Sequence, residues 1–240
     1  MRHALLELHD VHVHYGLSHV LQGVEMTVAA GEVVGLFGRN GVGKTTVIKT
    51  VAGWLTPSAG SVRFAGHVIG GGLPPDRICR LGIGLVPEDR RVFPSLTVDE
   101  NLRLGFLQAP DRPRRVMLDR LKRVYARFPR LSDRRGQLGK TLSGGEQQML
   151  AMARVLVGEP KLLLIDEPTE GLAPIIADEI FALITQLQQD GIAILLVEQK
   201  VHRALDVCAR CYVMARGRIV FEGAATAAAD RDAILSRLAV

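Results

Sequence analysis

Short apolar runs alternate with segments of helical periodicity along most of the chain. An apolar run bounded by glycine, proline or charged residues is typical of a strand buried on both faces of a parallel sheet, and apolar residues three and four apart predict an amphipathic helix. The predicted core strands are 32–37, 83–87, 162–166 and 192–197. The predicted helices are 44–52, 143–156 and 175–189. This alternation predicts an α/β fold, in which a mostly parallel sheet is flanked by helices.

Two regions of the chain depart from this alternation and predict subdomains. Short alternating strands and turns at 5–28 and 60–68 predict an antiparallel β subdomain beside the core. The pattern from 101 to about 157 is mainly helical, which predicts a helical subdomain. We therefore expect one domain, 1–240, built from a core with its β subdomain and from a helical subdomain. The core is assigned to about 1–87 and 158–240, and the helical subdomain to about 88–157.

Glycine and proline mark the connections between these elements. The stretches 57–60 and 70–75 are rich in both residues and are interpreted as turns or loops within the domain. Near the end of the chain, 213–220 predicts a hairpin around Arg216-Gly217, and 224–240 predicts a terminal helix.

The segment between the first core strand and its helix fits the pattern G-x-x-x-x-G-K-[ST]. Its glycines let the backbone curl, so that successive N–H groups and the positive end of the helix point at phosphates. Lys44 would reach the β- and γ-phosphates, and the Thr45 hydroxyl would bind Mg²⁺. A chance glycine-rich loop is the alternative, but the strand and the helix around it disfavour that. The nucleotide-binding candidates here are Gly38, Arg39, Asn40, Gly41, Val42, Gly43, Lys44, Thr45 and Thr46.

The core strand 162–166 ends in two carboxylates, Asp166 and Glu167. A central parallel strand delivers such residues to the carboxyl edge of its sheet, where ligands bind. We expect Asp166 to hold the magnesium shell and Glu167 to orient and polarise the attacking water. An acidic pair that only caps the next helix is the alternative, and the phosphate loop favours the catalytic interpretation.

A third motif, Ser143-Gly144-Gly145-Glu146, opens the helix 143–156. Ser143 is a plausible N-cap, and on a purely structural interpretation capping the helix is the whole role of this segment. The two glycines, however, leave the free N–H groups of the helix uncovered, which suits close approach to an anion. The phosphate loop of this chain already covers one face of a nucleotide. The segment therefore has a use only if a second nucleotide-binding domain exists.

Together, the three motifs and their spacing resemble the nucleotide-binding subunit of ATP-binding cassette (ABC) transporters, over almost the whole chain. The resemblance implies an ABC-type P-loop NTPase core that binds ATP and Mg²⁺. It also implies a head-to-tail dimer with a homologous ATPase subunit or a second copy, in which each ATP lies between the phosphate loop of one subunit and the segment 142–148 of the other. Closure on ATP and opening after hydrolysis would drive a membrane partner.

Further family positions can be located one by one. Tyr15 follows a short strand, where such subunits place an aromatic ring that stacks on adenine; an aromatic residue of the core is the alternative. Glu88 stands where most members have a glutamine that contacts magnesium and senses the membrane domain. Gln199 stands where most have a histidine that touches the γ-phosphate, and it can still donate a hydrogen bond although it cannot titrate. Ala173 replaces the usual aspartate of the loop that communicates across the dimer.

These departures, with the segments 90–94 and 96–102, resemble one branch of the family, the LivF-type ATP-binding proteins of branched-chain amino acid importers. That resemblance implies two transmembrane permease subunits and, indirectly, an extracytoplasmic amino-acid-binding protein. A related branch that serves urea and short amides shares much of the pattern, so the cargo stays open.

Two other classes of protein also stay open. A non-transport ABC ATPase that acts on nucleic acid or ribosomes usually has two cassettes or long insertions, whereas this chain has one compact cassette. Alternatively, Glu88, Gln199 and Ala173 mark a nucleotide sensor that binds but barely hydrolyses. The retention of Lys44, Asp166 and Glu167 favours an active ATPase.

Composition fits a peripheral subunit. The chain has 240 residues, 48% of them hydrophobic, enough for a substantial core, and no apolar run approaches the length of a membrane span or signal peptide. We therefore expect a position at the cytoplasmic face of a bacterial inner membrane, held there by a partner.

The sequence pI of about 9.4 would suit nucleic acid, but the positive charge concentrates at 112–140 with helical spacing. A solvated helix face is the simpler interpretation, and we expect no nucleic-acid partner. The resemblance places this stretch in the helical subdomain, which with the segment near Glu88 forms the groove for the coupling helices of the permeases.

Cysteine and histidine residues suggest metal binding only weakly. Cys208 and Cys211 have the spacing of a metal pair, but structural zinc needs a second pair and the remaining cysteine is Cys79, so we interpret all three as small buried residues. His12 and His14 are two apart and would share one face of a strand. An exposed strand face is the simpler explanation, because no carboxylate-rich or cysteine-rich segment accompanies them.

Overall fold

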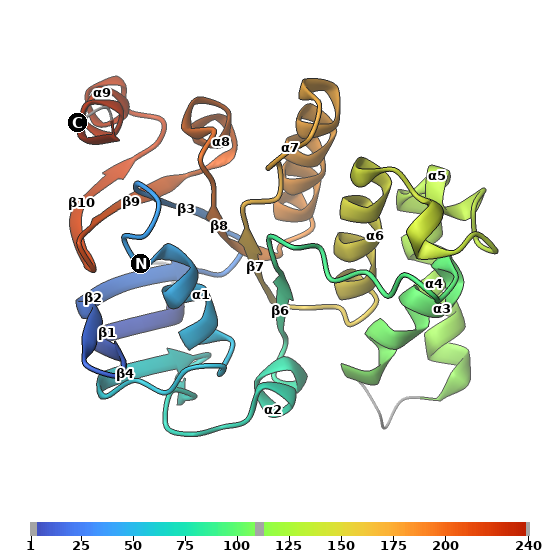
Figure 1. The fold of residues 1–240 in the computed structure, drawn as a ribbon, viewed down its shortest axis with the longest axis horizontal. Coiled ribbons are helices and arrows are strands. Elements are labelled where there is room, and N and C mark those ends of the chain that lie inside the picture. The colour runs from blue at the N-terminus through green and yellow to red at the C-terminus, as the bar shows by residue number, and fades with distance from the viewer. Residues whose placement is uncertain (1–3, 109–112, 239–240) are drawn as a thin grey trace.

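Two β-sheets organise the protein in the computed structural model, which describes residues 4–108 and 113–238 (Figure 1). The larger sheet has six strands in the order β10-β9-β3-β8-β7-β6, and all its neighbours are parallel except β9 and β10. Its strands are β3 (Val33–Phe37), β6 (Ile83–Val86), β7 (Leu162–Asp166), β8 (Ala193–Val197), β9 (Arg210–Ala215) and β10 (Arg218–Ala224). The mostly parallel core predicted from the apolar runs is therefore confirmed.

The smaller sheet is antiparallel and has four strands in the order β2-β1-β4-β5. Its strands are β1 (Ala4–Tyr15), β2 (Ser18–Ala29), β4 (Ala59–Phe64) and β5 (His67–Val68). The predicted antiparallel β region is confirmed, although β4 begins at Ala59, inside the stretch that was predicted to be a turn. The predicted hairpin around Arg216-Gly217 is also confirmed, since it joins β9 to β10.

Helices cover both faces of the large sheet and form a separate helical region (Figure 1). The helices are α1 (Lys44–Val51), α2 (Pro75–Arg80), α3 (Val98–Gly105), α4 (Arg114–Arg127), α5 (Pro129–Ser132), α6 (Gly144–Leu156), α7 (Pro174–Gln189), α8 (Val201–Val207) and α9 (Ala228–Leu238), with short 3-10 turns η1 (Phe106–Gln108) and η2 (Gly139–Thr141). Helices α2 and α8 were not predicted. The terminal helix was predicted to start at 224, which is wrong, because Ala224 still pairs in β10 and the helix begins four residues later. Residues 239–240 of that prediction lie outside the described residues.

Alternate residues of the central strands face two separate hydrophobic clusters. On β3, Val33 and Phe37 belong to the cluster that includes α6, α7 and α8, whereas Val34 and Leu36 belong to the cluster shared with α1 and the antiparallel sheet. Because both faces are covered, every residue of β3, β7 and β8 is buried. Burial on both sides explains why these strands are continuous apolar runs in the sequence.

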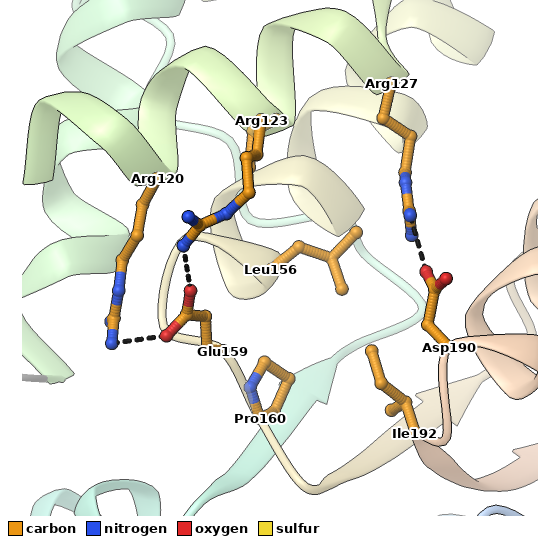
Figure 2. Close-up of a pocket in the computed structure, with 9 residues that line it drawn as sticks. Arg120, Arg123, Arg127, Leu156, Glu159, Pro160, Asp190 and Ile192 are labelled. Atoms are coloured by element: carbon orange, nitrogen blue, oxygen red, sulfur yellow. Dashed lines mark hydrogen bonds and ion pairs between the residues drawn. The ribbon is translucent and has the colours of Figure 1, made fainter. Parts of the chain in front are cut away.

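Ion pairs join helix α4 to the loops beside the large sheet (Figure 2). Arg120, only 6% exposed, lies 2.6 Å from a carboxylate oxygen of Glu159, and Arg123 pairs with the other oxygen of the same carboxylate. Arg127 lies 2.5 Å from Asp190, which follows α7. The three arginines thus connect the helical region to the ends of two core elements. Within the described ranges, no helix has both the length and the apolar character needed to cross a bilayer.

Candidate active site

The loop between β3 and α1 folds around the side chain of Lys44. This side chain is 4% exposed, and its Nζ donates to the carbonyl oxygens of Gly38 at 2.9 Å and of Arg39 at 3.1 Å. The same Nζ lies 3.8 Å from Oε1 of Glu167. The ammonium group is therefore already positioned at the mouth of the loop. Backbone carbonyls hold it there, and phosphate oxygens could replace them.

Glycine is required at two positions of this loop. Gly43, the N-cap of α1, has φ +114°, and a Cβ there would lie 2.9 Å from Cδ2 of Leu21. Gly38 has φ +155°, and a Cβ there would lie 2.4 Å from the carbonyl oxygen of Met214. Side chains are excluded at both positions, so the loop can hold its curled form with the N-terminus of α1 facing outward. That terminus provides free N–H groups and a partial positive charge for an anion.

Asp166 has the features expected of a ligand for a hard cation. It ends β7, is 3% exposed, and its Oδ1 is buried without a hydrogen-bond partner among the described residues. Burial raises the pKa of Asp166, whereas the hydrogen bond with Thr45 and the charge of Lys44 lower it. Thr45, Glu88 and Asp166 line one cavity of about 180 Å³. An orphaned carboxylate oxygen beside a hydroxyl and a second carboxylate is the oxygen donor set that suits Mg²⁺.

Glu167 is held in an unusual backbone conformation next to the phosphate loop. Its φ is +46°, in the left-handed region that is uncommon for residues other than glycine, and only 8% of the residue is exposed. Such conformations persist where surrounding structure enforces them, often at functional sites. Desolvation raises the pKa of Glu167, and Glu170 raises it further, while Gln199 and Lys44 oppose the shift. This carboxylate is therefore a stronger base than an exposed glutamate.

A cavity of about 280 Å³ brings half of the predicted site residues together, with Lys44, Glu167 and Gln199 among them. Its lining residues are Val20, Asn40, Gly41, Gly43, Lys44, Thr45, Thr46, Glu88, Glu167, Glu170 and Gln199. Gly38 and Arg39 contribute through the carbonyl groups that hold Lys44, and the Val42 carbonyl accepts from Gly217 N at 3.0 Å. Tyr15 lies outside this lining, at the end of β1, and is 45% exposed. It is therefore no core residue, and its ring is accessible to a ligand.

Sequence reasoning missed two acidic residues of this region. The carboxylates of Glu88, Glu167 and Glu170 place one oxygen each within 4.8 Å of one another. Glu170 follows the acidic pair by three residues, where it resembles an ordinary surface residue in the sequence. The third carboxylate concentrates negative charge at the edge of the phosphate site, which a bound cation would offset.

The second missed residue is Glu198, a buried clamp between the ends of β7 and β8. It is 2% exposed. Its Oε1 accepts from the backbone N–H of Thr169 at 3.1 Å and from the Thr169 hydroxyl at 2.5 Å. Its Oε2 accepts from the backbone N–H groups of Gln199 at 2.8 Å and Lys200 at 2.9 Å. Glu198 thus fixes the loop that carries Glu167 relative to the loop that carries Gln199.

The segment that begins with Ser143 lies apart from the phosphate loop in the described part of the chain. Ser143 and Glu146 form a reciprocal capping box, with Ser143 N donating to Glu146 Oε2 at 2.8 Å and Glu146 N donating to Ser143 Oγ at 3.3 Å. A Cβ on Gly145 would lie 2.8 Å from Cγ2 of Ile176, so that glycine also has a packing role. Ser143, Gly145 and Glu146 line a different cavity, between α5, α6 and α7, and Gly144 adjoins them. The Ser143 segment and the phosphate loop therefore line different cavities of the same chain.

The remaining candidates have simple structural roles. Ala173 is the N-cap of α7 and precedes Pro174 in its first turn. Cys208 and Cys211 are buried, as predicted, and a hydrogen bond with Cys211 together with burial raises the pKa of Cys208. Cys79 is only partly buried, so the prediction for that residue is wrong. It lies on α2, a short helix with one buried residue, Ile78.

Comparisons with known proteins agree with this geometry. A family model described as "ABC transporter" matches residues 21–170. The high-affinity branched-chain amino acid transport ATP-binding protein BraG of Pseudomonas aeruginosa is 45% identical over 216 residues, which cover 90% of this chain and 91% of that protein. The lipopolysaccharide export system ATP-binding protein LptB of Haemophilus influenzae is 35% identical over 209 residues, with 87% and 86% coverage. A crystal structure of a nucleotide-free ATP-binding cassette from an ABC transporter matches with a TM-score of 0.87 and 27% identity, covering 98% of this chain and 96% of that one.

Proposed function

The chain belongs to the ABC transporter family, whose cassettes bind and hydrolyse ATP, and from this premise we propose that it is the ATP-hydrolysing subunit of an importer for branched-chain amino acids. The observation that carries the catalytic part is the convergence of Lys44, Glu167 and Gln199 on one cavity. The choice of cargo is supported by the likeness to BraG, which covers nearly the whole of both chains.

The phosphate loop binds the triphosphate. Backbone N–H groups from Asn40 to Thr46 and the N-terminus of α1 face the β- and γ-phosphates, and Lys44 exchanges the carbonyls of Gly38 and Arg39 for phosphate oxygens. The ammonium is already in place, so binding requires little reorganisation. Tyr15, exposed at the end of β1, stacks on the adenine ring.

Thr45, Asp166 and Glu88 would hold Mg²⁺, which when bound would offset the negative charge of the phosphate oxygens. Among this chain's own groups, Glu167 acts as general base. It accepts a proton from the water that attacks the γ-phosphorus, and the bond from that phosphorus to the bridging oxygen of ADP breaks. Desolvation raises the pKa of Glu167 and so improves it as a base. Gln199 orients this carboxylate and donates to the γ-phosphate when nucleotide is present.

A head-to-tail dimer completes the site. The Ser143, Gly144, Gly145 and Glu146 segment of the partner, a homologous subunit or a second copy, covers the γ-phosphate of this chain's ATP. The separation of the two motifs into different cavities within one chain supports this arrangement. The capping box fixes Ser143 at the N-terminus of α6, where the helix favours an anion.

The membrane partners dock in a groove beside Glu88. Two adjoining cavities share Trp54, Leu85, Pro87 and Arg91, and Trp54 is 40% exposed with the Arg91 guanidinium 4.6 Å from the centre of its ring. Glu88 lines both this groove and the nucleotide cavity, so a permease helix seated in the groove can sense the nucleotide. Two permease subunits would hold the protein peripherally at the cytoplasmic face of a bacterial inner membrane.

Purification of the full-length chain with its natural membrane partners tests the proposal. We expect two permease polypeptides and an ATPase partner, together with an extracytoplasmic receptor of the same assembly that binds leucine, isoleucine or valine. A receptor specific for urea or a short amide would establish the related importer branch instead. Because LptB is also a relative, an assembly that carries a lipid would refute the import proposal while leaving the ATPase chemistry intact.

Docking can be measured independently, because Trp54 is the only tryptophan of the sequence. Binding of a peptide from a cytoplasmic permease loop should change the fluorescence of Trp54, and Arg91→Ala should weaken that change. Copurification with nucleic acid and no permease would instead support the non-transport class of ABC ATPase.

A further inference from the structure

Three histidines converge on the outer surface of the hairpin formed by β1 and β2. His12 Nδ1 lies 3.0 Å from His19 Nε2, and His12 Nε2 lies 3.0 Å from Oδ1 of Asp10. Because a carboxylate only accepts, the ring of His12 carries its proton on Nε2. The lone pair of Nδ1 then faces His19. The third ring, His14, stacks on His19 with 4.1 Å between ring centres and 9° between planes.

Irregularities in the hairpin register bring these side chains together. His12 pairs with Gln22 and His14 pairs with His19, with one register shift just before His12 and another between Val13 and His14. Gly23, in the left-handed region at φ +73°, leaves room for the Asp10 carboxylate, since a Cβ there would lie 2.9 Å from Asp10 Oδ1. His19 therefore reaches the face of the sheet that carries His12. Sequence spacing within β1 alone could not show this.

His14 holds the His19 ring in its position. Nδ1 of His14 lies 2.9 Å from the hydroxyl of Ser58, which itself donates to the backbone carbonyl of His12 at 3.2 Å. The stacked pair is thus anchored to the strand β4 side of the sheet as well as to the hairpin. Two imidazole nitrogens are consequently presented at a fixed separation on an accessible surface.

We propose that His12 Nδ1 and His19 Nε2 bind a divalent transition-metal ion of the zinc, nickel and copper class. Nitrogens that share one such ion each lie about 2.0–2.1 Å from it and so are about 3–3.4 Å apart, which a small rotation of the rings from 3.0 Å provides. Asp10 accepts from the other nitrogen of His12, as carboxylates beside metal-binding histidines do. Water completes the coordination.

The donor set distinguishes this site from the acidic one. Imidazole selects zinc, nickel and copper, whereas the carboxylates of Glu88, Glu167 and Glu170 suit magnesium. Desolvation and the nearby rings of His14 and His12 lower the pKa of His19. The site is next to Tyr15 and to Val20, which lines the nucleotide cavity. Its existence is independent of the proposed cargo.

Calorimetric titration of the full-length protein without a polyhistidine tag tests the site. Zinc chloride or copper sulfate is added in excess magnesium, which occupies the carboxylates. We expect one bound ion, and we expect His12→Gln and His19→Gln each to lower the affinity at least about tenfold, with Asp10→Asn lowering it by about tenfold. His67→Gln, on the exposed strand β5, is the matched control and should bind as the parent does.

Binding that is equal in the parent, His12→Gln and His19→Gln would overturn the proposal, as would the absence of binding by a protein whose circular dichroism shows an intact fold. Loss of binding in His9→Gln but not in His19→Gln would do the same, because His9 contacts Glu7 and lies outside the cluster. Anomalous scattering at the zinc edge from crystals grown with the ion gives a direct view. A peak between His12 and His19 is the supporting result.

Discussion

Gln199 donates a hydrogen bond from its Nε2 to Oε2 of Glu167, with 2.5 Å between the two atoms. The other oxygen of this carboxylate, Oε1, lies 3.8 Å from Nζ of Lys44. Glu167 is therefore oriented from two sides, by a residue after β8 and by the first residue of α1. A histidine at position 199 could do the same only in a protonation state with a donor nitrogen facing Glu167, whereas the amide donates at every pH.

The first prediction concerns Gln199 itself. In Gln199→Ala the orienting hydrogen bond is lost, and turnover by the assembled complex should fall about ten- to a hundredfold, because such a bond to a charged group contributes about 1.5–3 kcal/mol. Gln199→His should keep more activity but add an ionisation near pH 6.5 to the profile of kcat. Steady-state phosphate release across the pH range measures both effects. Identical pH profiles for the parent and Gln199→His would contradict the assignment of Gln199 to the reacting site.

The second prediction concerns the general base. Glu167→Gln should retain ATP binding, trap the closed dimer and lower turnover by about 10²–10⁴-fold, because the amide cannot accept the proton of the attacking water. Binding is followed with a fluorescent ATP analogue and the dimer by light scattering with ATP and Mg²⁺. Glu25→Gln, at an exposed position of β2, is the control. Near-normal hydrolysis by Glu167→Gln would remove this residue from its role.

The strands and the phosphate loop could be predicted because local sequence determines them. Each residue of β7 and β8 is buried on a sheet covered on both faces, so the apolar run alone indicates the strand. Helix α2 gives no such pattern, because Ile78 is its only buried residue and glycines and prolines precede it. Helix α8 is seven residues long, with buried residues Ala204 and Leu205, too short for a clear helical period.

Parts of the site that depend on tertiary pairing could not be predicted in the same way. Glu198 accepts from Thr169, 29 residues earlier, and this contact exists only because β7 and β8 are neighbours in the sheet. Glu170 lies near Glu88 only because Glu88 follows the end of β6, a strand far from Glu170 in the sequence. Motifs identify groups whose spacing is local, such as Lys44 after its glycines. Strand order decides which distant carboxylates meet.

The third prediction is a pH dependence of stability. Desolvation raises the pKa of Glu167. A carboxyl group with a raised folded-state pKa contributes stability below its unfolded pKa of about 4.3, and that contribution is lost as pH rises through the folded value. Glu167→Gln should therefore melt at a higher temperature than the parent at neutral pH, with the difference shrinking as pH falls toward 4. Differential scanning calorimetry without nucleotide and with EDTA measures it.

A control separates this charge effect from a general one. Glu25→Gln removes one negative charge from an exposed position and should leave the melting temperature nearly unchanged at every pH. If Glu167→Gln melts below the parent at neutral pH, then the ion pair with Lys44 outweighs the desolvation of Glu167, and the predicted sign is wrong.

The fourth prediction concerns the buried clamp. Glu198→Gln replaces one acceptor oxygen by an NH₂ group that faces N–H donors, so at least one buried hydrogen bond is lost. We expect a decrease of about 1–3 kcal/mol in the free energy of unfolding. Turnover should fall as well, because Glu198 bonds both Thr169, in the loop that carries Glu167, and Gln199. Urea unfolding and phosphate release measure the two effects, and unchanged turnover in a destabilised variant would limit Glu198 to a structural role.

The fifth prediction concerns the ion pairs that join α4 to the core (Figure 2). Glu159→Gln should destabilise the protein by about 1–2 kcal/mol, because Arg120 is 6% exposed and would lose its charged partner while keeping the Val157 carbonyl, 3.2 Å from its Nη1, and the Phe106 ring. This figure allows for screening, since the Glu159 side chain is 46% exposed. Asp190→Asn is the matched control, because its partner Arg127 has a side chain 31% exposed to water, and its effect should stay below about 1 kcal/mol. Urea denaturation compares the free energies of unfolding of the two variants. Equal decreases in the two variants would show that burial of Arg120 does not strengthen its ion pair with Glu159.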